Sequence, residues 1–391
     1  MKRFLYLSAL ACLVGSAGMA SAAPPPAAVG DIDVMTQNQY IGGDVLPIIG
    51  AISADPAVFN AAVVHVIETV AANRTAARVA AMAGEIAARK PHLVGLQEVW
   101  DVECIPAMPE LNGYPCTDPA LAAAWGDHLA LTQQALGSAY YVAAVVENFK
   151  VNSFGPYPGI PFTYNGVPAF VTVLDRDVIL ARSDVTATPF TAYPCNHPSV
   201  DGCNYDVDIP LPELGTSVKR SFVMVDATVN GHAYRFVNTH LETEQSANIP
   251  GFIQSAEAAQ LAGTVLAVTP PGMRLIVVGD TNSDPSDPSP FNPYTKDYVP
   301  TPYWIFADAG FNDAWLGRPG NVAGLSCCQL EDLSNRVSVL GRRVDLILTR
   351  EMPRKVKDAR LIGEVAADRL MPHGRGLWPS DHASVAAKLG Y

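Results

Sequence analysis

Short apolar runs along the chain alternate with polar, glycine- and proline-rich segments, a pattern that predicts more strands than helices. Ile32, Val34 and Thr36 alternate with polar neighbours and predict a strand over 31–37. Asn230-Gly231, between the apolar runs 221–229 and 233–239, predicts a β-hairpin because these residues accept the positive φ of a two-residue turn. Further strands are predicted over 93–99, 140–146, 274–279, 344–349 and 383–389.

Apolar residues at helical spacing are less frequent. Helices are predicted over 55–72, 74–90 and 255–268. Asn73 is the expected N-cap of the second helix, and Pro91 ends it. Segment 104–119 is predicted as a loop, and 148–168, rich in Gly, Pro and aromatic residues, as a longer loop or lid. Many strands with few helices between them predict an α+β protein of layered sheets, and no linker divides 31–391.

The first residues have the pattern of an export signal. Lys2 and Arg3 precede an apolar run, and Ala20-Ser21-Ala22 has the small residues of a cleavage site. We expect residues 1–22 to be a signal peptide and 23–30 a Pro/Ala-rich leader, so that the mature chain is secreted or periplasmic. One alternative is a membrane anchor, but the apolar run is shorter than the ~18 residues of a spanning helix. The other alternative is a lipid anchor at Cys12.

The acidic composition limits the choice of partners. A net charge of -12 at pH 7 does not attract nucleic acid broadly, so no stable nucleic-acid complex is expected. An enzyme could still reach one phosphate through a local site. The basic residues between Arg350 and Arg360 are either such a patch or a solvated face.

The cysteine count favours disulfides. Seven cysteines fall to six when Cys12 leaves with the signal, and an even number in an exported chain is typical of bridged pairs. The two bridges expected to close short loops are Cys104–Cys116 and Cys195–Cys203. The adjacent Cys327 and Cys328 are either a vicinal bridge or two thiols. The Cys and His spacing of a zinc site is absent from the sequence.

Several predicted strands end on a carboxylate or an amide. Asn38 follows the first strand, and Glu98 ends a buried apolar run. Asp280 and Asn282 follow the strand over 274–279. Charged groups at strand ends are costly to bury without partners, and clustered hard oxygens suit Mg²⁺. Each residue alone has a plainer interpretation as a turn or helix-cap residue, so the argument depends on the whole set.

Six short motifs occur in order from the first strand to the last: V-M-T-Q-N at 34–38, L-Q-E-V at 96–99, N-T-H-L at 238–241, G-D-T-N at 279–282, R-V-D-L at 343–346 and S-D-H at 380–382. Together they resemble the successive motifs of the endonuclease/exonuclease/phosphatase family. The resemblance implies a four-layer α/β/β/α sandwich, in which two packed mixed β-sheets are flanked by helices. It also implies metal-assisted hydrolysis of a phosphate ester by in-line attack of an activated water.

The resemblance also implies roles for individual residues. The implied metal ligands are Asn38, Glu98 and Asp381. The implied catalytic residues are His240, Asp280, Asn282, Asp345 and His382. Asp280 resembles the residue that positions or deprotonates the water, and Asn282 the amide that holds the phosphate. His240 resembles a phosphate-contacting or leaving-group histidine, and His382 the terminal histidine oriented by Asp345. Either Asp280 or His382 could be the general base.

Two features of these motifs leave alternatives open. The family often has an acid two residues after the first asparagine, where this chain has Tyr40. Asp44 lies further on and either substitutes for that acid or belongs to the loop. Asp345 could orient a histidine or simply pair with Arg342 or Arg343.

The expected function is that of a secreted, Mg²⁺-dependent phosphodiesterase in which Mn²⁺ can substitute. The N-T-H-L motif followed by Glu242 is similar to sphingomyelinase-like and small-substrate members, so a phospholipid or a small phosphodiester is the first choice. The alternative is an extracellular deoxyribonuclease-like endonuclease. Aromatic residues of 148–168 could contact lipid, stack on a base or simply pack the loop. We expect a monomer that contacts membrane surfaces transiently.

Other classes fit the sequence less well. The mature chain lacks G-x-S-x-G, and no lysine follows a glycine, so a serine hydrolase elbow and a P-loop are disfavoured. A non-catalytic secreted binding module on the same fold would have lost some of the motif positions, and the central ones are all present.

Overall fold

The computed structural model describes residues 30–212, 215–243, 251–371 and 376–391. The expected signal peptide at 1–22 lies outside the described residues, as does the expected leader apart from Gly30. No helix within the described part of the chain is long and apolar enough to cross a membrane.

The first sheet contains nine of the strands in the described residues, in the order β20-β21-β1-β2-β7-β3-β4, with β5 and β6 also paired to β7. β1 runs parallel to β2 and antiparallel to β21, so the sheet is mixed. Its strands are β1 (Asp31–Asn38), β2 (Leu93–Gln97), β3 (Asp101–Pro106), β4 (Gly126–Asp127), β5 (Tyr140–Val151), β6 (Ile160–Tyr164), β7 (Val167–Arg182), β20 (Lys355–Ile362) and β21 (Ser384–Gly390).

The second sheet contains eight strands within the same described ranges, in the order β18-β19-β15-β14-β13-β10-β9, with β8 paired to β13. β14 is parallel to β15, and the other pairs are antiparallel, so this sheet is also mixed. Its strands are β8 (Thr186–Pro189), β9 (His197–Ser199), β10 (Gly202–Asn204), β13 (Ser221–Val229), β14 (His232–His240), β15 (Arg274–Asp280), β18 (Asn312–Asp313) and β19 (Asp345–Thr349).

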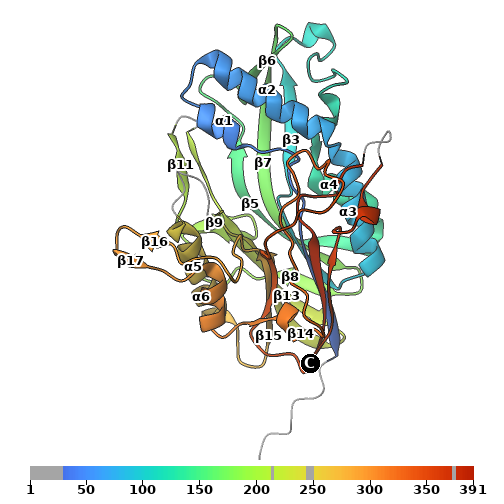
Figure 1. Ribbon diagram of the computed structural model, residues 1–391, viewed down its shortest axis with the longest axis vertical. Coiled ribbons are helices and arrows are strands. Elements are labelled where there is room, and N and C mark those ends of the chain that lie inside the picture. The colour runs from blue at the N-terminus through green and yellow to red at the C-terminus, as the bar shows by residue number, and fades with distance from the viewer. Residues whose placement is uncertain (1–29, 213–214, 244–250, 372–375) are drawn as a thin grey trace, which may run out of the picture.

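The two sheets pack face to face, and helices cover their outer faces. The core between the sheets includes Val34 and Ile179 from the first sheet and Phe236 and Val278 from the second. Figure 1 shows α3 (Thr75–Arg89) and α4 (His128–Leu136) on one side of the sheets and α5 (Phe252–Val268) and α6 (Pro302–Asp308) on the other. The expected four-layer sandwich is therefore confirmed.

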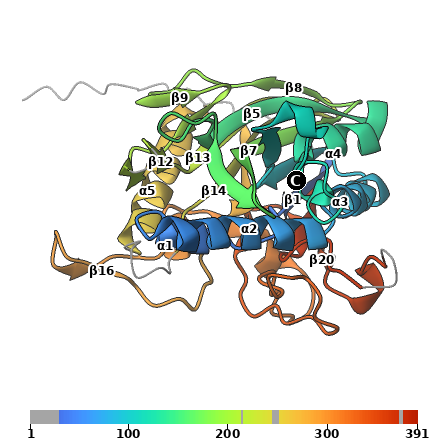
Figure 2. The ribbon, with the colours of Figure 1, turned by 90° about the horizontal axis from the view of Figure 1, so that it is seen from above.

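Besides short 3-10 helices, the described residues contain two further α-helices and two short hairpins. They are α1 (Leu46–Ala51), α2 (Pro56–Ala72), β11 (Ile209–Leu211) with β12 (Thr216–Val218), and β16 (Phe291–Asn292) with β17 (Asp297–Tyr298). Seen from above, α1 and α2 follow one another along one face of the molecule (Figure 2). The predicted hairpin between β13 and β14 is confirmed, with φ of 50° at Asn230 and 79° at Gly231.

The predicted loops at 104–119 and 148–168 are partly wrong. β3 continues to Pro106, β5 runs to Val151, and β6 lies inside the expected lid. The reason is tertiary, because the long strand β7 offers pairing partners to β3, β5 and β6 along its length. Aromatic residues of this region pack against the protein, with Phe154 stacked on Phe59 at 5.7 Å between ring centroids.

Asn73 does not cap the helix after it. Arg74 occupies the N-cap position of α3, and Asn73 Nδ2 instead donates to the carbonyl oxygens of Gly42 at 2.8 Å and Glu331 at 2.9 Å. Asn73 thus joins two loops to the start of the helix.

The six cysteines of the described residues lie in pairs. The disulfides in the structure are Cys104–Cys116, with Cα atoms 5.6 Å apart, Cys195–Cys203, with Cα atoms 5.9 Å apart, and Cys327–Cys328. Lys355, Lys357 and Arg360 of the basic segment lie on the edge strand β20, where Lys357 pairs with Asp31 and Arg360 with Asp358. These ion pairs support the interpretation of this segment as a solvated face.

Candidate active site

Three predicted site residues lie side by side in the second sheet. The strand register places His240 opposite Asp280 and Asp280 opposite Asp345. Asn282 follows with φ of 48°. Its backbone N–H donates to Asp280 Oδ1 at 2.9 Å, and its side-chain Nδ2 donates to the Leu241 carbonyl at 2.9 Å. The carboxyl ends of β14 and β15 therefore bring the N-T-H-L and G-D-T-N motifs into contact.

Asn238 connects this row to the first sheet. Its Nδ2 donates to the carbonyl oxygens of Leu96 at 2.8 Å and Val178 at 3.1 Å, and its Oδ1 accepts from Gln97 Nε2 at 2.6 Å. Gly95 leaves room for it, since a Cβ there would lie 2.5 Å from Asn238 Oδ1. The buried amide thus fixes how the ends of the two sheets face each other.

The first sheet supplies Asn38 and Glu98 to the same place. Asn38 Nδ2 donates to Glu98 Oε1 and to Asp280 Oδ2, both at 3.1 Å. Glu98 has φ of 54° directly after β2 and also accepts from Trp100 Nε1 at 3.2 Å. The amide oxygen of Asn38 accepts from the backbone N–H of Tyr40 at 2.9 Å. In this structure Asn38 therefore links the two carboxylates through its nitrogen.

Asp345 and His382 form a direct pair. His382 Nδ1 lies 2.8 Å from Asp345 Oδ2, and His382 Nε2 lies 3.6 Å from Asp280 Oδ2. Burial alone would lower the pKa of His382, but the carboxylates of Asp345, Asp280 and Asp381 hold it well above its usual range. The imidazole therefore favours its charged form, with Nδ1–H directed to Asp345.

Asp381 lies beside this pair and near Glu98. Burial, followed by repulsion from Glu98 and Asp280, raises the pKa of Asp381 to about 7, although His382 and Arg78 act in the opposite direction. Carboxylates that repel one another in a buried site are a donor set that suits a hard divalent cation. The oxygens of Glu98 and Asp381 thus fit the expected metal ligands.

Arg78 holds the loops that carry these ligands. This fully buried side chain donates to the carbonyl oxygens of Gln39 at 3.1 Å, Tyr40 at 2.9 Å and Pro379 at 3.0 Å. Desolvation lowers the pKa of Arg78 to about 10, and Asp381 and Glu98 oppose that shift. Arg78 is therefore a positioning residue beneath the carboxylates, which the motifs did not indicate.

His240 has a cation as its neighbour instead of a carboxylate. Arg220 Nη1 lies 3.2 Å from His240 Nδ1, and a guanidinium can only donate, so the proton of the neutral ring is on Nε2. Nε2 lies 3.2 Å from Asn282 Nδ2 and 3.5 Å from Asp280 Oδ2. Burial, Arg220 and His382 lower the pKa of His240 well below its usual range. His240 is therefore a neutral ring whose Nε2 faces Asp280 and Asn282.

Arg220 belongs to a buried charge network that the motifs did not indicate. It pairs with Glu242 at 3.2 Å and with Asp175 at 4.0 Å. Burial raises the pKa of Asp175 to about 7 and raises the pKa of Asp177 well above its usual range. Acidic residues that interrupt the apolar run over 171–181 were the sequence signal for this network.

The structure decides the alternatives that the motifs left open at two positions. Asp44 is exposed in the loop, where its side chain accepts from the Leu46 backbone N–H at 2.8 Å, so it does not replace the missing acid. Arg343 pairs with Asp313 and Arg342 with Asp287, whereas Asp345 faces His382.

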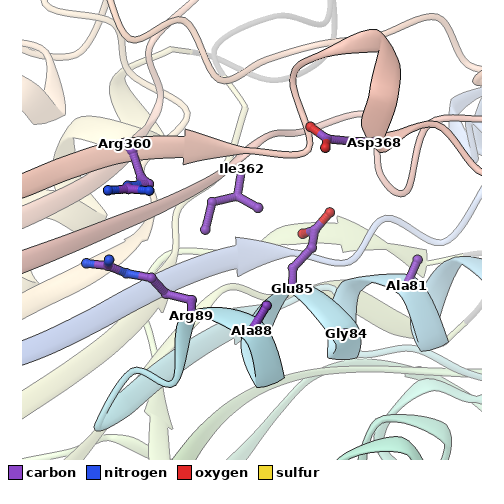
Figure 3. A pocket seen from close by; sticks show the side chains of 8 residues that line it. All are labelled: Ala81, Gly84, Glu85, Ala88, Arg89, Arg360, Ile362 and Asp368. Carbon is purple, nitrogen blue, oxygen red and sulfur yellow. The ribbon is translucent and has the colours of Figure 1, made fainter.

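A cavity of about 560 Å³ lies between α3 and β20, and the predicted site residues do not line it. Figure 3 shows Arg89 and Arg360 at one end and Glu85 and Asp368 towards the other, with Ile362 between them. Burial, followed by repulsion from Asp368 and Glu364, raises the pKa of Glu85 to about 8.

Comparisons with known proteins agree with the observed fold. Among curated proteins, none matches the chain significantly. The fold is similar to that of the mannosyl-6-phosphatase Bt3783 of Bacteroides thetaiotaomicron, with a TM-score of 0.51, 14% identity and coverage of 92% of this chain and 100% of that one. It is also similar to an endonuclease/exonuclease/phosphatase family protein of the same organism, with a TM-score of 0.51, 14% identity and coverage of 92% and 98%.

At this level of identity, the two solved structures support the fold alone. The sequence supplies the family, because the model of the Endonuclease/Exonuclease/phosphatase family matches residues 57–382, which include all the predicted site residues except Asn38. The chain therefore belongs to the endonuclease/exonuclease/phosphatase family.

Proposed function

We propose that this protein is a metal-dependent phosphodiesterase that hydrolyses its substrate by in-line attack of water. Members of the family are generally hydrolases of phosphoester bonds. The observation that carries the proposal is the position of Asp280, whose Oδ2 lies 3.5 Å from His240 Nε2 and 3.6 Å from His382 Nε2 and accepts from Asn38. A carboxylate between two histidines of opposite charge preference is suited to positioning a water beside a phosphate.

The family is metal-dependent, and the donor atoms fit a hard cation. Glu98 and Asp381, with Asn38 beside them, would hold Mg²⁺, for which Mn²⁺ could substitute. When bound, the cation would neutralise negative charge on the phosphate and polarise its ester. A second group, Asp280 with Asp345 and His382, also has its ligand atoms within 4.8 Å of one another.

The protein's own side chains can divide the remaining tasks. Asp280 orients or deprotonates the water, and Asn282 holds a phosphate oxygen. His382 is charged, and Asp345 fixes its orientation, so Nε2 can donate to the phosphate. His240, kept neutral by burial and Arg220, donates through Nε2. Both histidines are thus hydrogen-bond donors to developing negative charge.

A phospholipid or small phosphodiester is the proposed substrate. The support is the net charge of -12, which disfavours broad contact with DNA. The aromatic residues of 148–168 lend little support, since Phe154 and Tyr157 stack on Phe59 and Phe170. Export and a monomeric state remain predictions, which intact-mass spectrometry of the mature chain and size-exclusion chromatography test.

The deciding experiment compares sphingomyelin, plasmid DNA, a sugar phosphate and a chromogenic phosphodiester, each with Mg²⁺ and with EDTA. We expect Mg²⁺-dependent turnover that is highest for sphingomyelin or the small diester. Glu98→Ala should remove most of this turnover, because it removes a metal ligand, whereas the exposed Glu103→Ala on β3 should not. Turnover that survives both EDTA and Glu98→Ala would contradict the metal site. Failure to hydrolyse any substrate would favour a binding module.

A further inference from the structure

Cys327 and Cys328 lie on a segment that is fixed against the candidate active site. The backbone N–H of Cys327 donates to the Arg342 carbonyl at 3.0 Å, and the Arg342 N–H donates back at 2.9 Å. On the other side, Gln329 N–H donates to the Asp381 carbonyl at 2.8 Å. Short bridges therefore place Cys327 between Arg342 and His382. These backbone hydrogen bonds hold the segment that carries the two sulfurs against the site.

The sulfurs lie beside the imidazole nitrogen that faces the reaction. Cys328 Sγ is 3.9 Å from His382 Nε2, and the ligand atoms of Cys327, Cys328 and His382 all lie within 4.8 Å of one another. Cys327 is buried, whereas Cys328 is exposed, so the group can be reached from solvent. This arrangement places two sulfur atoms and one nitrogen at one point of the site.

The hydrogen bond to Asp345 prepares His382 for a metal. Metal-binding histidines almost always donate their second ring N–H to a carboxylate or carbonyl, which fixes the tautomer and makes the ligand more basic. Here Nδ1 pairs with Asp345 Oδ2 at 2.8 Å, which leaves Nε2 for a ligand. Two thiolates and an imidazole prefer Zn²⁺ and related thiophilic cations, in contrast to the oxygen donors Glu98 and Asp381.

We propose that Cys327, Cys328 and His382 form a second metal site, specific for a thiophilic divalent cation such as Zn²⁺, that becomes available when the Cys327–Cys328 disulfide is reduced. In the disulfide the sulfurs are bonded to each other and are not thiolates. A phosphine reductant supplies two electrons: the S–S bond breaks, each sulfur takes a proton from water, and the phosphine becomes its oxide. Zn²⁺ then displaces the two thiol protons and the proton of His382 Nε2 to solvent.

The site would compete with catalysis because both use the same nitrogen. A cation on His382 Nε2 prevents this atom from contacting a phosphate, so Zn²⁺ should inhibit the reduced protein much more than the oxidised protein. This inhibition rests on the proposed phosphodiesterase function, whereas Zn²⁺ binding does not. The two ideas can therefore fail separately.

The test uses the mature protein, oxidised or reduced with a phosphine, and titrates it with Zn²⁺ against a chromogenic chelator. Co²⁺ serves as a spectroscopic substitute, because thiolate ligands produce a sulfur-to-metal charge-transfer band. The matched control is the double variant Cys327→Ser/Cys328→Ser, which keeps the cysteines of the other two disulfides. Cys328→Ser alone changes an exposed side chain, so it is the control if the double variant does not fold.

We expect one additional Zn²⁺ equivalent and the charge-transfer band in reduced wild-type protein only. Asp345→Asn should weaken this Zn²⁺ affinity by ~10- to 100-fold, as expected for loss of a carboxylate that supports a ligating histidine. Equal Zn²⁺ binding by reduced wild-type protein and the cysteine variants would overturn the proposal. So would a Co²⁺ complex of the reduced protein without sulfur ligation, whatever the activity measurements show.

Discussion

The two sheets each bring one histidine to Asp280, but the surroundings of the two rings are opposite. His240, at the end of β14, has Arg220 against Nδ1, and its pKa is lowered by burial and by that cation. His382, just before β21, has Asp345 against Nδ1, and its carboxylate neighbours outweigh burial and raise its pKa. The partner of Nδ1 therefore acts together with burial at His240 and against burial at His382.

This difference in surroundings gives His240 and His382 different roles, which the residue type alone does not indicate. Near neutral pH one ring is neutral and the other is charged, although both Nε2 atoms lie at similar distances from Asp280 Oδ2. Enzymes commonly assign acid and base roles by giving like groups different environments. The following predictions test whether this contrast governs the site.

The largest effect is expected from removing His382. His382→Ala should lower kcat by ~10²–10⁴-fold, as is typical for a positioned acid or base, and should also lower the melting temperature, because the buried carboxylate of Asp345 loses its partner. Asp345→Asn should lower kcat by a smaller factor, because the His382 ring remains but loses the carboxylate that orients it. Steady-state kinetics and thermal melting of both variants measure these effects.

The double variant tests whether His382 and Asp345 act together. If they act as a unit, His382→Ala/Asp345→Asn should be little worse than His382→Ala alone. The matched control is His65→Ala, which removes an exposed histidine of α2 and should leave kcat unchanged. Two independent, multiplying losses would show that the pair does not work as one.

An intermediate effect is expected from removing the cation beside His240. Arg220→Gln should raise the pKa of His240 and destabilise the fold by about 3–5 kcal/mol, since Glu242 and Asp175 lose a buried partner. Histidine NMR titration and urea unfolding measure the two changes. Arg220→Lys keeps a positive charge, so its His240 pKa and its stability should lie between those of Arg220→Gln and the wild type. An unchanged His240 pKa in Arg220→Gln would mean that burial alone keeps the ring neutral.

The smallest effect concerns Glu85, behind the strands that carry the site. It accepts from Gln37 Nε2 at 3.0 Å and is hydrogen-bonded to Ser384. Its pKa is raised from 4.5 to about 8, so its contribution to stability is complete below pH 4.5 and is lost as pH rises through 8. Glu85→Gln should flatten this part of the melting-temperature profile between pH 4.5 and 8.

Glu85→Gln also sharpens the comparison of the histidines. The exposed Glu103→Gln is the control and should leave the profile unchanged. If Glu85→Gln shifts the pH dependence of kcat as strongly as that of stability, the activity profile cannot be assigned to the two histidines alone.

Local patterns predicted those features that depend on near neighbours. The Asn230-Gly231 turn and the apolar run within β15 follow from turn chemistry and hydrophobicity within a few residues. The secondary-structure predictions failed where strands pair with residues further along the chain. In 148–168, for example, β7 supplies pairing partners to the glycine-rich segments that were predicted as a loop. The motifs also named both Asp345 and His382, which meet at 2.8 Å.

The sequence by itself determined the family, the order of the motif residues and the composition of the site. Only the tertiary structure decided how those residues are paired. Asn38 meets Asp280 across 242 positions, and Cys328 meets His382 across 54, through sheet register and packing. Side-chain charge and hydrogen bonding depend on what lies within a few ångströms, and for residues far apart in the chain the fold alone establishes those neighbours.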